Sequence, residues 1–84
     1  MSPMRKVKEV RALPGFQLEV VFDTGETRYF DVTPYLGKGI FKALADEAYF
    51  RQVQVKFDGV AWPQEQDLSP DTLYLLGRPE RLAA

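Results

Sequence analysis

The chain has 84 residues, with 11 lysines and arginines, 12 aspartates and glutamates, and neither histidine nor cysteine. This length suits one domain with one modest core, and the balanced charge provides no excess positive field for binding nucleic acid without a partner. The missing imidazole and thiol groups exclude histidine-dependent nucleophilic triads, thiolate nucleophiles, disulfides and cysteine zinc sites.

Three strands are expected in the first part of the chain. Residues 6–13 carry valines among charged residues, which is typical of a short, partly exposed strand. After the turn at Pro14-Gly15, apolar and polar residues alternate over residues 16–22, which predicts a strand with one solvated face. Gly25 allows the chain to reverse, so residues 26–32 should form the second arm of a hairpin.

Short helices are expected in the middle of the chain. Thr33 is placed to cap a short helix that Pro34 would begin. Apolar residues three to four positions apart over residues 40–52 predict one broken helix or two abutting pieces, the second starting at Asp46. The residues expected on the inward face of these pieces are Ile40, Phe41, Leu44 and Ala48.

A second pair of strands is expected after these helices. Val53, Val55 and Phe57 alternate with polar residues, which predicts a strand that ends at Gly59. Residues 60–62 are apolar and are expected to pair back across this strand.

The last predicted helix has the strongest start signal in the chain. Ser69 is a favourable cap, a proline follows at the first helical position, and the Asp71 carboxylate lies near the positive end of the helix dipole. Leu73 and Leu76 are expected to face the sheet, and Gly77 is expected to end the helix.

Together these elements predict an α+β fold: an antiparallel sheet of about five short strands with two or three short helices packed on it. Residues 1–84 should form a single domain, with residues 1–4 and 79–84 frayed. No apolar run approaches the ~20 residues that span a bilayer, and no apolar signal segment opens the chain. We therefore expect a cytoplasmic protein without membrane contact.

Four segments of the sequence form a pattern that is shared with a known family. They are residues 22–26, 31–36, 50–57 and 62–74, of which the last, from Trp62-Pro63 to Tyr74, is the most specific. In these segments the chain resembles the bacterial domain-of-unknown-function 2442 family. The resemblance implies a small α+β domain, sometimes joined to a helix-turn-helix segment and often encoded in neighbourhoods that resemble toxin–antitoxin pairs. It implies no activity and no catalytic residue.

The candidate interaction surface consists of Trp62, Pro63, Asp67, Asp71 and Tyr74. Trp62 can be a hot-spot anchor for a partner or a packing residue, and we favour packing. Asp58, Asp67 and Asp71 carry three carboxylates that can hold Mg²⁺ or Ca²⁺. Capping and loop hydrogen bonds explain Asp67 and Asp71 without a metal, and we favour that explanation.

The function expected from the sequence is that of a protein-interaction or regulatory module that binds a protein partner or a second copy, as in a toxin–antitoxin-like pair. One alternative is an accessory domain for nucleic-acid recognition that works with a separate DNA-binding chain. A second, less favoured alternative is a carboxylate- or metal-dependent enzyme built on Asp58, Asp67 and Asp71. We expect neither catalytic activity nor a cofactor.

Overall fold

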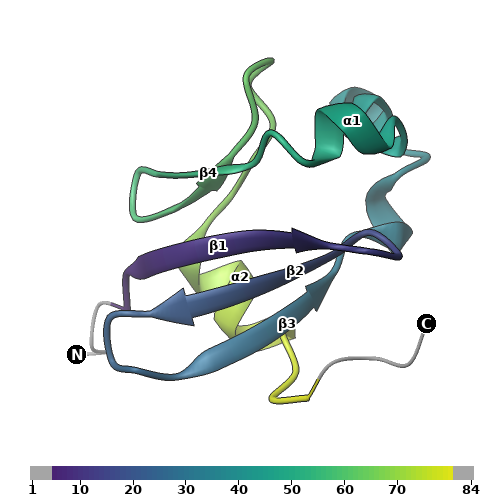
Figure 1. The fold of residues 1–84 in the computed structure, drawn as a ribbon. Helices are drawn as coiled ribbons and strands as arrows, with labels where there is room; N and C mark the ends of the chain where they lie inside the picture. The colour runs from purple at the N-terminus through teal and green to yellow at the C-terminus, as the bar shows by residue number, and fades with distance from the viewer. Residues whose placement is uncertain (1–4, 81–84) are drawn as a thin grey trace.

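Two three-stranded antiparallel sheets and several short helices make up the computed structural model of the chain, which describes residues 5–80 (Figure 1). The first sheet has the order β1-β2-β3, and the second has the order β4-β5-β6. The α+β class is confirmed, but the expectation of one sheet of about five strands is wrong. The strands are β1 (Val7–Leu13), β2 (Gln17–Phe22), β3 (Thr27–Asp31), β4 (Gln54–Lys56), β5 (Gly59–Ala61) and β6 (Asp67–Leu68).

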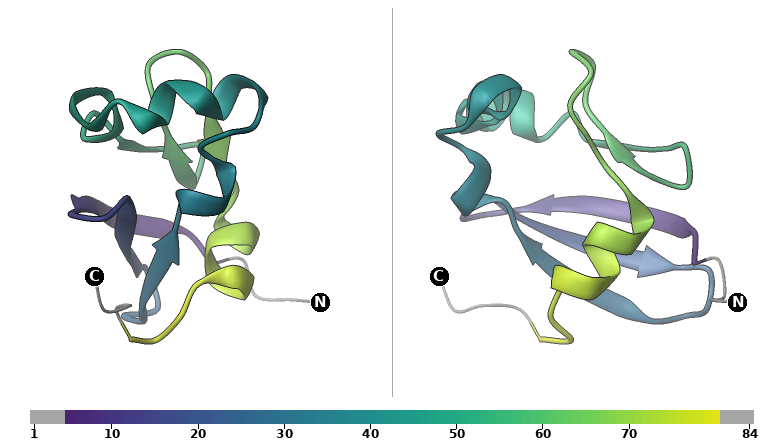
Figure 2. Two further views of the ribbon diagram at one scale, coloured as in Figure 1. Left: turned by 90° about the vertical axis from the view of Figure 1, so that its right-hand side faces the viewer. Right: turned by 180° about the vertical axis from the view of Figure 1, so that it is seen from behind.

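The strands separate into two sheets because a helical connection carries the chain from the first sheet to the level of the second (Figure 2). The second sheet meets the first at the β4–β5 turn, where the backbone N–H of Val7 donates to the carbonyl of Asp58 at 2.8 Å. Side chains of both sheets fill the space between them, so the sheets form two layers around a shared core.

The predicted hairpin of the first sheet is confirmed. In β2 and β3, Leu18 lies opposite Phe30 and both are buried, as the alternation of apolar residues requires. Gly25 adopts a φ of 91° where the chain reverses, a conformation that glycine reaches without a steric penalty.

The helical connection contains η1 (Thr33–Tyr35), η2 (Gly39–Ala45) and α1 (Glu47–Phe50). Asp46 starts α1 as predicted, because its carboxylate accepts from the Ala48 N–H at 3.0 Å. The predicted cap at Thr33 is wrong. Thr33 is the first residue of η1, and the Asp31 carboxylate accepts from its N–H at 3.0 Å and its hydroxyl at 2.7 Å.

The inward face predicted for residues 40–52 is only partly correct. Leu44 is fully buried and Phe41 is half-buried, but Ile40 is 61% exposed and Ala48 is also exposed. The connection is not one α-helix: η2 is a 3₁₀-helix with about three residues per turn, and the extended Asp46 interrupts the path before α1. Residues three to four positions apart therefore do not all lie on one inward face, as they would in a continuous α-helix.

Helix α2 (Pro70–Leu76) begins as predicted, with the Ser69 hydroxyl accepting from the Thr72 N–H at 3.1 Å. Leu73 is fully buried, but the predicted inward position of Leu76 is wrong, because Leu76 is 62% exposed. The helix ends against the first sheet at Gly77, where an added Cβ would lie 3.0 Å from the Cβ of Arg28.

Arg78 continues the chain alongside β3 rather than leaving the surface. The N–H of Tyr29 donates to the Arg78 carbonyl at 2.7 Å, and the N–H of Arg78 donates to the Tyr29 carbonyl at 2.9 Å. Pro79 and Glu80 follow as exposed residues. Of the residues expected to be frayed, 1–4 and 79–84, only Pro79 and Glu80 lie within the described part of the chain, so the expectation for the others lies outside it.

The core lies between the two sheets and under α2. None of the helices in residues 5–80 has the length and apolar composition that a membrane span requires. The buried core residues are Val7, Leu18, Val20, Phe22, Phe30, Val32, Leu44, Phe50, Val60, Trp62, Leu68 and Leu73.

The close approach of β5 to β6 predicts that Gly59→Ala is strongly destabilising. The added Cβ would lie 2.2 Å from the Leu68 carbonyl oxygen and 3.2 Å from the Cδ of Pro70, so the backbone must shift. We expect the free energy of unfolding to fall by about 2 kcal/mol or more. Gly37→Ala is the matched control, since its added Cβ meets nothing within 4 Å, and it should change stability by less than about 1 kcal/mol. Equal urea midpoints for the two variants would contradict this assignment.

Candidate protein-binding groove

A groove of about 340 Å³ crosses the second sheet on the face that points away from the core. Neighbouring residues of a strand point to opposite faces, so Ala61 lies on the outer face because Val60 is fully buried in the core. Strand β5 lies between β4 and β6, so Ala61 forms the floor and the flanking strands supply the walls. We call this site the Phe57 groove; its lining residues are Lys56, Phe57, Ala61, Trp62, Pro63, Glu65 and Asp67.

Phe57 lies at the rim of the groove, and its backbone conformation is unfavourable for a bulky residue. Phe57 and Asp58 alone join β4 to β5, with φ values of 53° and 65°. Two positive φ values are typical of a type I′ turn, which favours Asn-Gly or Asp-Gly. A bulky side chain in the left-handed region costs roughly 1–2 kcal/mol. The Phe57 side chain is 79% exposed, so burial of the ring offsets little of this cost.

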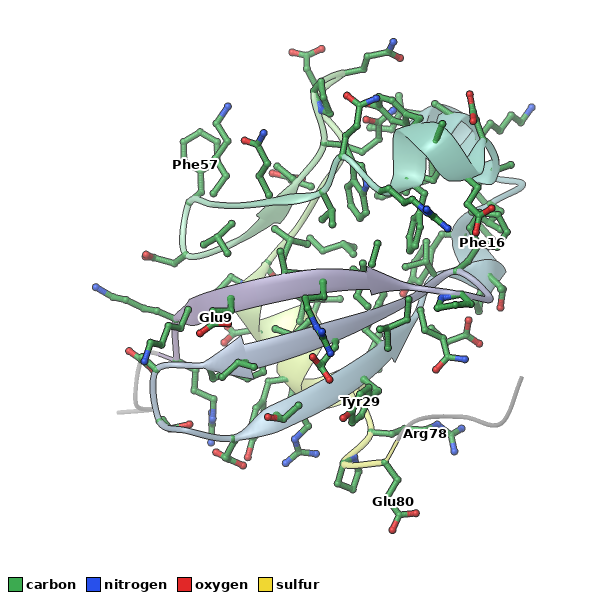
Figure 3. All side chains as sticks on the ribbon, in the orientation of Figure 1. Glu9, Phe16, Tyr29, Phe57, Arg78 and Glu80 are labelled. Atoms are coloured by element: carbon green, nitrogen blue, oxygen red, sulfur yellow. The ribbon has the colours of Figure 1, made fainter. Side chains whose placement is uncertain are left out.

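The turn that carries the exposed ring is nevertheless attached to the rest of the molecule. The Asp58 carbonyl is fixed by its hydrogen bond from the Val7 N–H, so the tip of the hairpin is attached to the first sheet. The Lys56 Nζ lies 5.4 Å from the centre of the Phe57 ring. Figure 3 shows Phe57 projecting from the tip of the hairpin, away from the first sheet. The backbone that carries the ring is therefore held in place, and the ring is presented to solvent.

The two walls of the groove carry opposite charges. Lys56 is on β4, whereas Asp67 is on β6 and Glu65 lies in the loop before it. Among the ion pairs formed by residues 5–80, none involves any of these three side chains. Their charges are thus free to meet charges on another molecule at the groove.

The loop before β6, which contains Glu65, is anchored by the buried side chain of Gln66, a residue that is only 2% exposed. The Gln66 side chain accepts a hydrogen bond from the Tyr49 hydroxyl at 2.6 Å and donates to the Ile40 carbonyl at 2.8 Å. The Tyr49 hydroxyl also accepts from the N–H of Gln64 at 2.7 Å. These hydrogen bonds satisfy the buried amide of Gln66 and anchor the loop to the helical connection where it borders the groove.

Trp62 is chiefly a packing residue, as favoured from the sequence. Its side chain is 4% exposed, and the indole N–H donates to the Phe50 carbonyl at 2.8 Å. Its ring stacks on that of Phe50 with the ring centres 6.1 Å apart. Trp62 therefore lines the groove with only a small exposed part and cannot be the exposed anchor of a partner.

The five residues of the sequence-based interaction surface do not form one site. Trp62, Pro63 and Asp67 line the Phe57 groove, whereas Asp71 and Tyr74 lie on α2 and do not line it. Sequence reasoning placed Phe57 inside a strand and did not recognise it as a candidate residue. The signal that identifies it is a bulky residue directly before Asp58-Gly59, where a tight turn favours asparagine or glycine.

Tyr74 belongs to a separate polar cluster with Arg5, Glu26 and Arg28. The guanidinium groups of Arg5 and Arg28 lie 3.7 Å and 4.3 Å from the centre of the Tyr74 ring, in cation–π geometry. Its hydroxyl donates to the Glu26 carboxylate at 2.9 Å. This hydrogen bond is the main reason why the pKa of Glu26 is lowered from 4.5; burial opposes the change, while Arg28 and Thr24 reinforce it.

The carboxylates considered for a metal site do not come together. Within residues 5–80, no group of three acidic side chains is arranged so that it could hold a metal ion. Asp71 instead lies in the first turn of α2, near the positive end of the helix dipole. Asp58, Asp67 and Asp71 therefore do not form a group of three carboxylates around one point.

A smaller hollow of about 220 Å³ lies beside β3. The Tyr35 ring, part of its wall, stacks on Phe30 with the ring centres 5.8 Å apart, so it is committed to packing. None of the candidate residues borders this hollow; its lining residues are Tyr29, Phe30, Asp31, Pro34, Tyr35, Leu76 and Arg78. The Phe57 groove is therefore the stronger candidate site.

The chain matches a known protein family along nearly all of its described length. A family model described as "Protein of unknown function (DUF2442)" matches residues 7–79. The matched region includes the whole Phe57 groove. No curated protein and no solved structure matches the chain.

The Tyr74–Glu26 hydrogen bond predicts a change in pH dependence. In Tyr74→Phe the pKa of Glu26 should rise toward 4.5, because the main group that lowers it is removed. A carboxylate with a lowered pKa stabilises the folded state above its unfolded-state pKa, and this contribution is lost as the pH falls through the folded-state pKa. Tyr74→Phe should therefore lose more stability at about pH 7 than at about pH 2.5.

An NMR titration of the Glu26 side chain and urea unfolding at both pH values check this prediction. Tyr29→Phe is the control, because the Tyr29 hydroxyl donates to Glu19 and not to Glu26. An unchanged Glu26 pKa in Tyr74→Phe would show that the hydroxyl is not the cause.

Proposed function

Because the chain belongs to the DUF2442 family of proteins of unknown function, we propose from its own geometry that it is a protein-interaction module without catalytic activity, working through the Phe57 groove. The observation that carries the proposal is the exposed phenylalanine at a turn position that disfavours it. Residues in strained backbone conformations concentrate at functional sites, where the surrounding structure maintains them. A bulky ring that lowers stability and is presented to solvent fits a contact residue.

The lining of the groove indicates the chemistry of the partner. Ala61 and Trp62, both largely buried, form a small apolar floor, and the exposed Phe57 ring adds an apolar wall. Glu65 and Asp67 provide an acidic side. The groove thus suits a protein segment that places an apolar side chain on the floor and a neighbouring lysine or arginine toward the carboxylates.

The groove also fits the energetic pattern of interaction sites. An aromatic ring on a rigid turn loses little conformational freedom on binding, because the backbone that carries it is already fixed. Burying the ring against a partner would remove its apolar surface from water, which favours binding. A partner chain, as in a toxin–antitoxin-like pair, is the biological setting that we propose for this contact.

The proposal predicts opposite effects of Phe57→Asn on stability and on binding. Asparagine tolerates the left-handed conformation, so the variant should be more stable than the wild type by about 0.5–1 kcal/mol. Loss of the ring should weaken partner binding about tenfold or more. Urea unfolding measures the first effect, and titration of the immobilised protein with the partner recovered from the source cells measures the second.

Leu75→Ser is the matched control for this experiment. Leu75 is 75% exposed, about as much as Phe57, but it lies on α2 outside the groove. The control should retain partner binding. If Phe57→Asn binds the partner as tightly as wild type does, or if Leu75→Ser loses binding equally, the groove is not the interaction site.

A further inference from the structure

We propose that the occupant of the Phe57 groove is the Lys56–Phe57 tip of a second copy of the chain, so that two copies exchange tips across a two-fold axis. This inference rests on the proposed function and specifies its partner. The groove suits an apolar side chain next to a cation, and Phe57 follows Lys56 directly in the sequence. The tip of the hairpin carries the groups that the groove accepts.

The tip and the groove are placed so that two copies can pair symmetrically. Tip and groove adjoin each other on one face of the second sheet, since Lys56 and Phe57 themselves form part of the groove wall. A surface that contains both a protruding element and its receptor can pair with a copy of itself in one closed, reciprocal contact. Each Phe57 ring would then cover the Ala61 floor of the other copy, and the contact would be made twice.

The charges of the tip and of the groove are complementary between two copies. Each wall of the groove carries charge of one sign, with Lys56 on β4 and the carboxylates of Glu65 and Asp67 across β5. Because none of these side chains forms an ion pair among the described residues, their charges are available to a partner. In the two-fold pair each lysine faces the carboxylates of the other copy, so opposite charges meet at both ends. The net charge of −1 per chain adds only weak repulsion.

The size of the contact sets the expected strength. An aromatic side chain buries roughly 150–250 Å², so two exchanged rings and their rims form an interface below about 1,200 Å², in the range of weak, transient complexes. The dimer should accordingly dissociate on dilution. Sedimentation equilibrium of the full chain over a series of concentrations measures this directly.

A charge-swap experiment tests the specific geometry. Lys56→Glu alone should lose self-association, because it places like charges together at both ends of the pair. The double variant Glu65→Lys/Asp67→Lys should lose it for the same reason. Mixing the two variants restores opposite charges at both ends, so the mixture should associate at least about tenfold more tightly than either variant alone. Circular dichroism melting confirms that each variant is folded.

The outcomes separate this inference from the proposed function. A wild-type chain that stays monomeric at the highest concentration, or a variant mixture that associates no better than its components, overturns the exchanged dimer. If a different partner is then bound by the wild type and lost in Phe57→Asn, the proposed function stands with another occupant. If Phe57→Asn changes neither self-association nor capture of any partner, both proposals fail.

Discussion

The hydrogen bond from the Val7 N–H to the Asp58 carbonyl is the contact on which the arrangement of the molecule depends. It joins the beginning of the first sheet to the turn of the second, and the shared core fills the space between them. Phe57 immediately precedes Asp58, so the same bond holds the turn from which the exposed ring projects. Because both partners are backbone groups, the turn is held by the path of the chain.

Elements that depend on local signals were predictable from the sequence. The hairpin around Gly25, the start of α1 at Asp46 and the Ser69 cap of α2 each follow from a few adjacent residues. The division into two sheets was not predictable, because alternation identifies strands but not which strands pair over long distances. The inward face of residues 40–52 was misassigned, since apolar spacing cannot distinguish an α-helix from 3₁₀ turns.

The site was predictable only in part, for a related reason. The motif beginning at Trp62 led to Pro63 and Asp67, which border the groove, and correctly favoured packing for the tryptophan. Phe57 was missed because its position continues the alternation of the preceding valines, whereas in the structure it is the first residue of a two-residue turn. A periodic pattern thus concealed a bulky, exposed residue in the left-handed backbone conformation. Gln66 was missed because nothing in the sequence marks an amide as buried.

The pairing of Arg78 with Tyr29 has a consequence for the behaviour of the protein at high concentration. A sheet edge with free N–H and C=O groups is a template on which further chains can assemble into aggregates. The bridge occupies both backbone groups of Tyr29 with a segment of the same chain (Figure 3). The molecule thereby caps part of the outer edge of β3 itself, which disfavours fibre-like stacking along this edge of the first sheet.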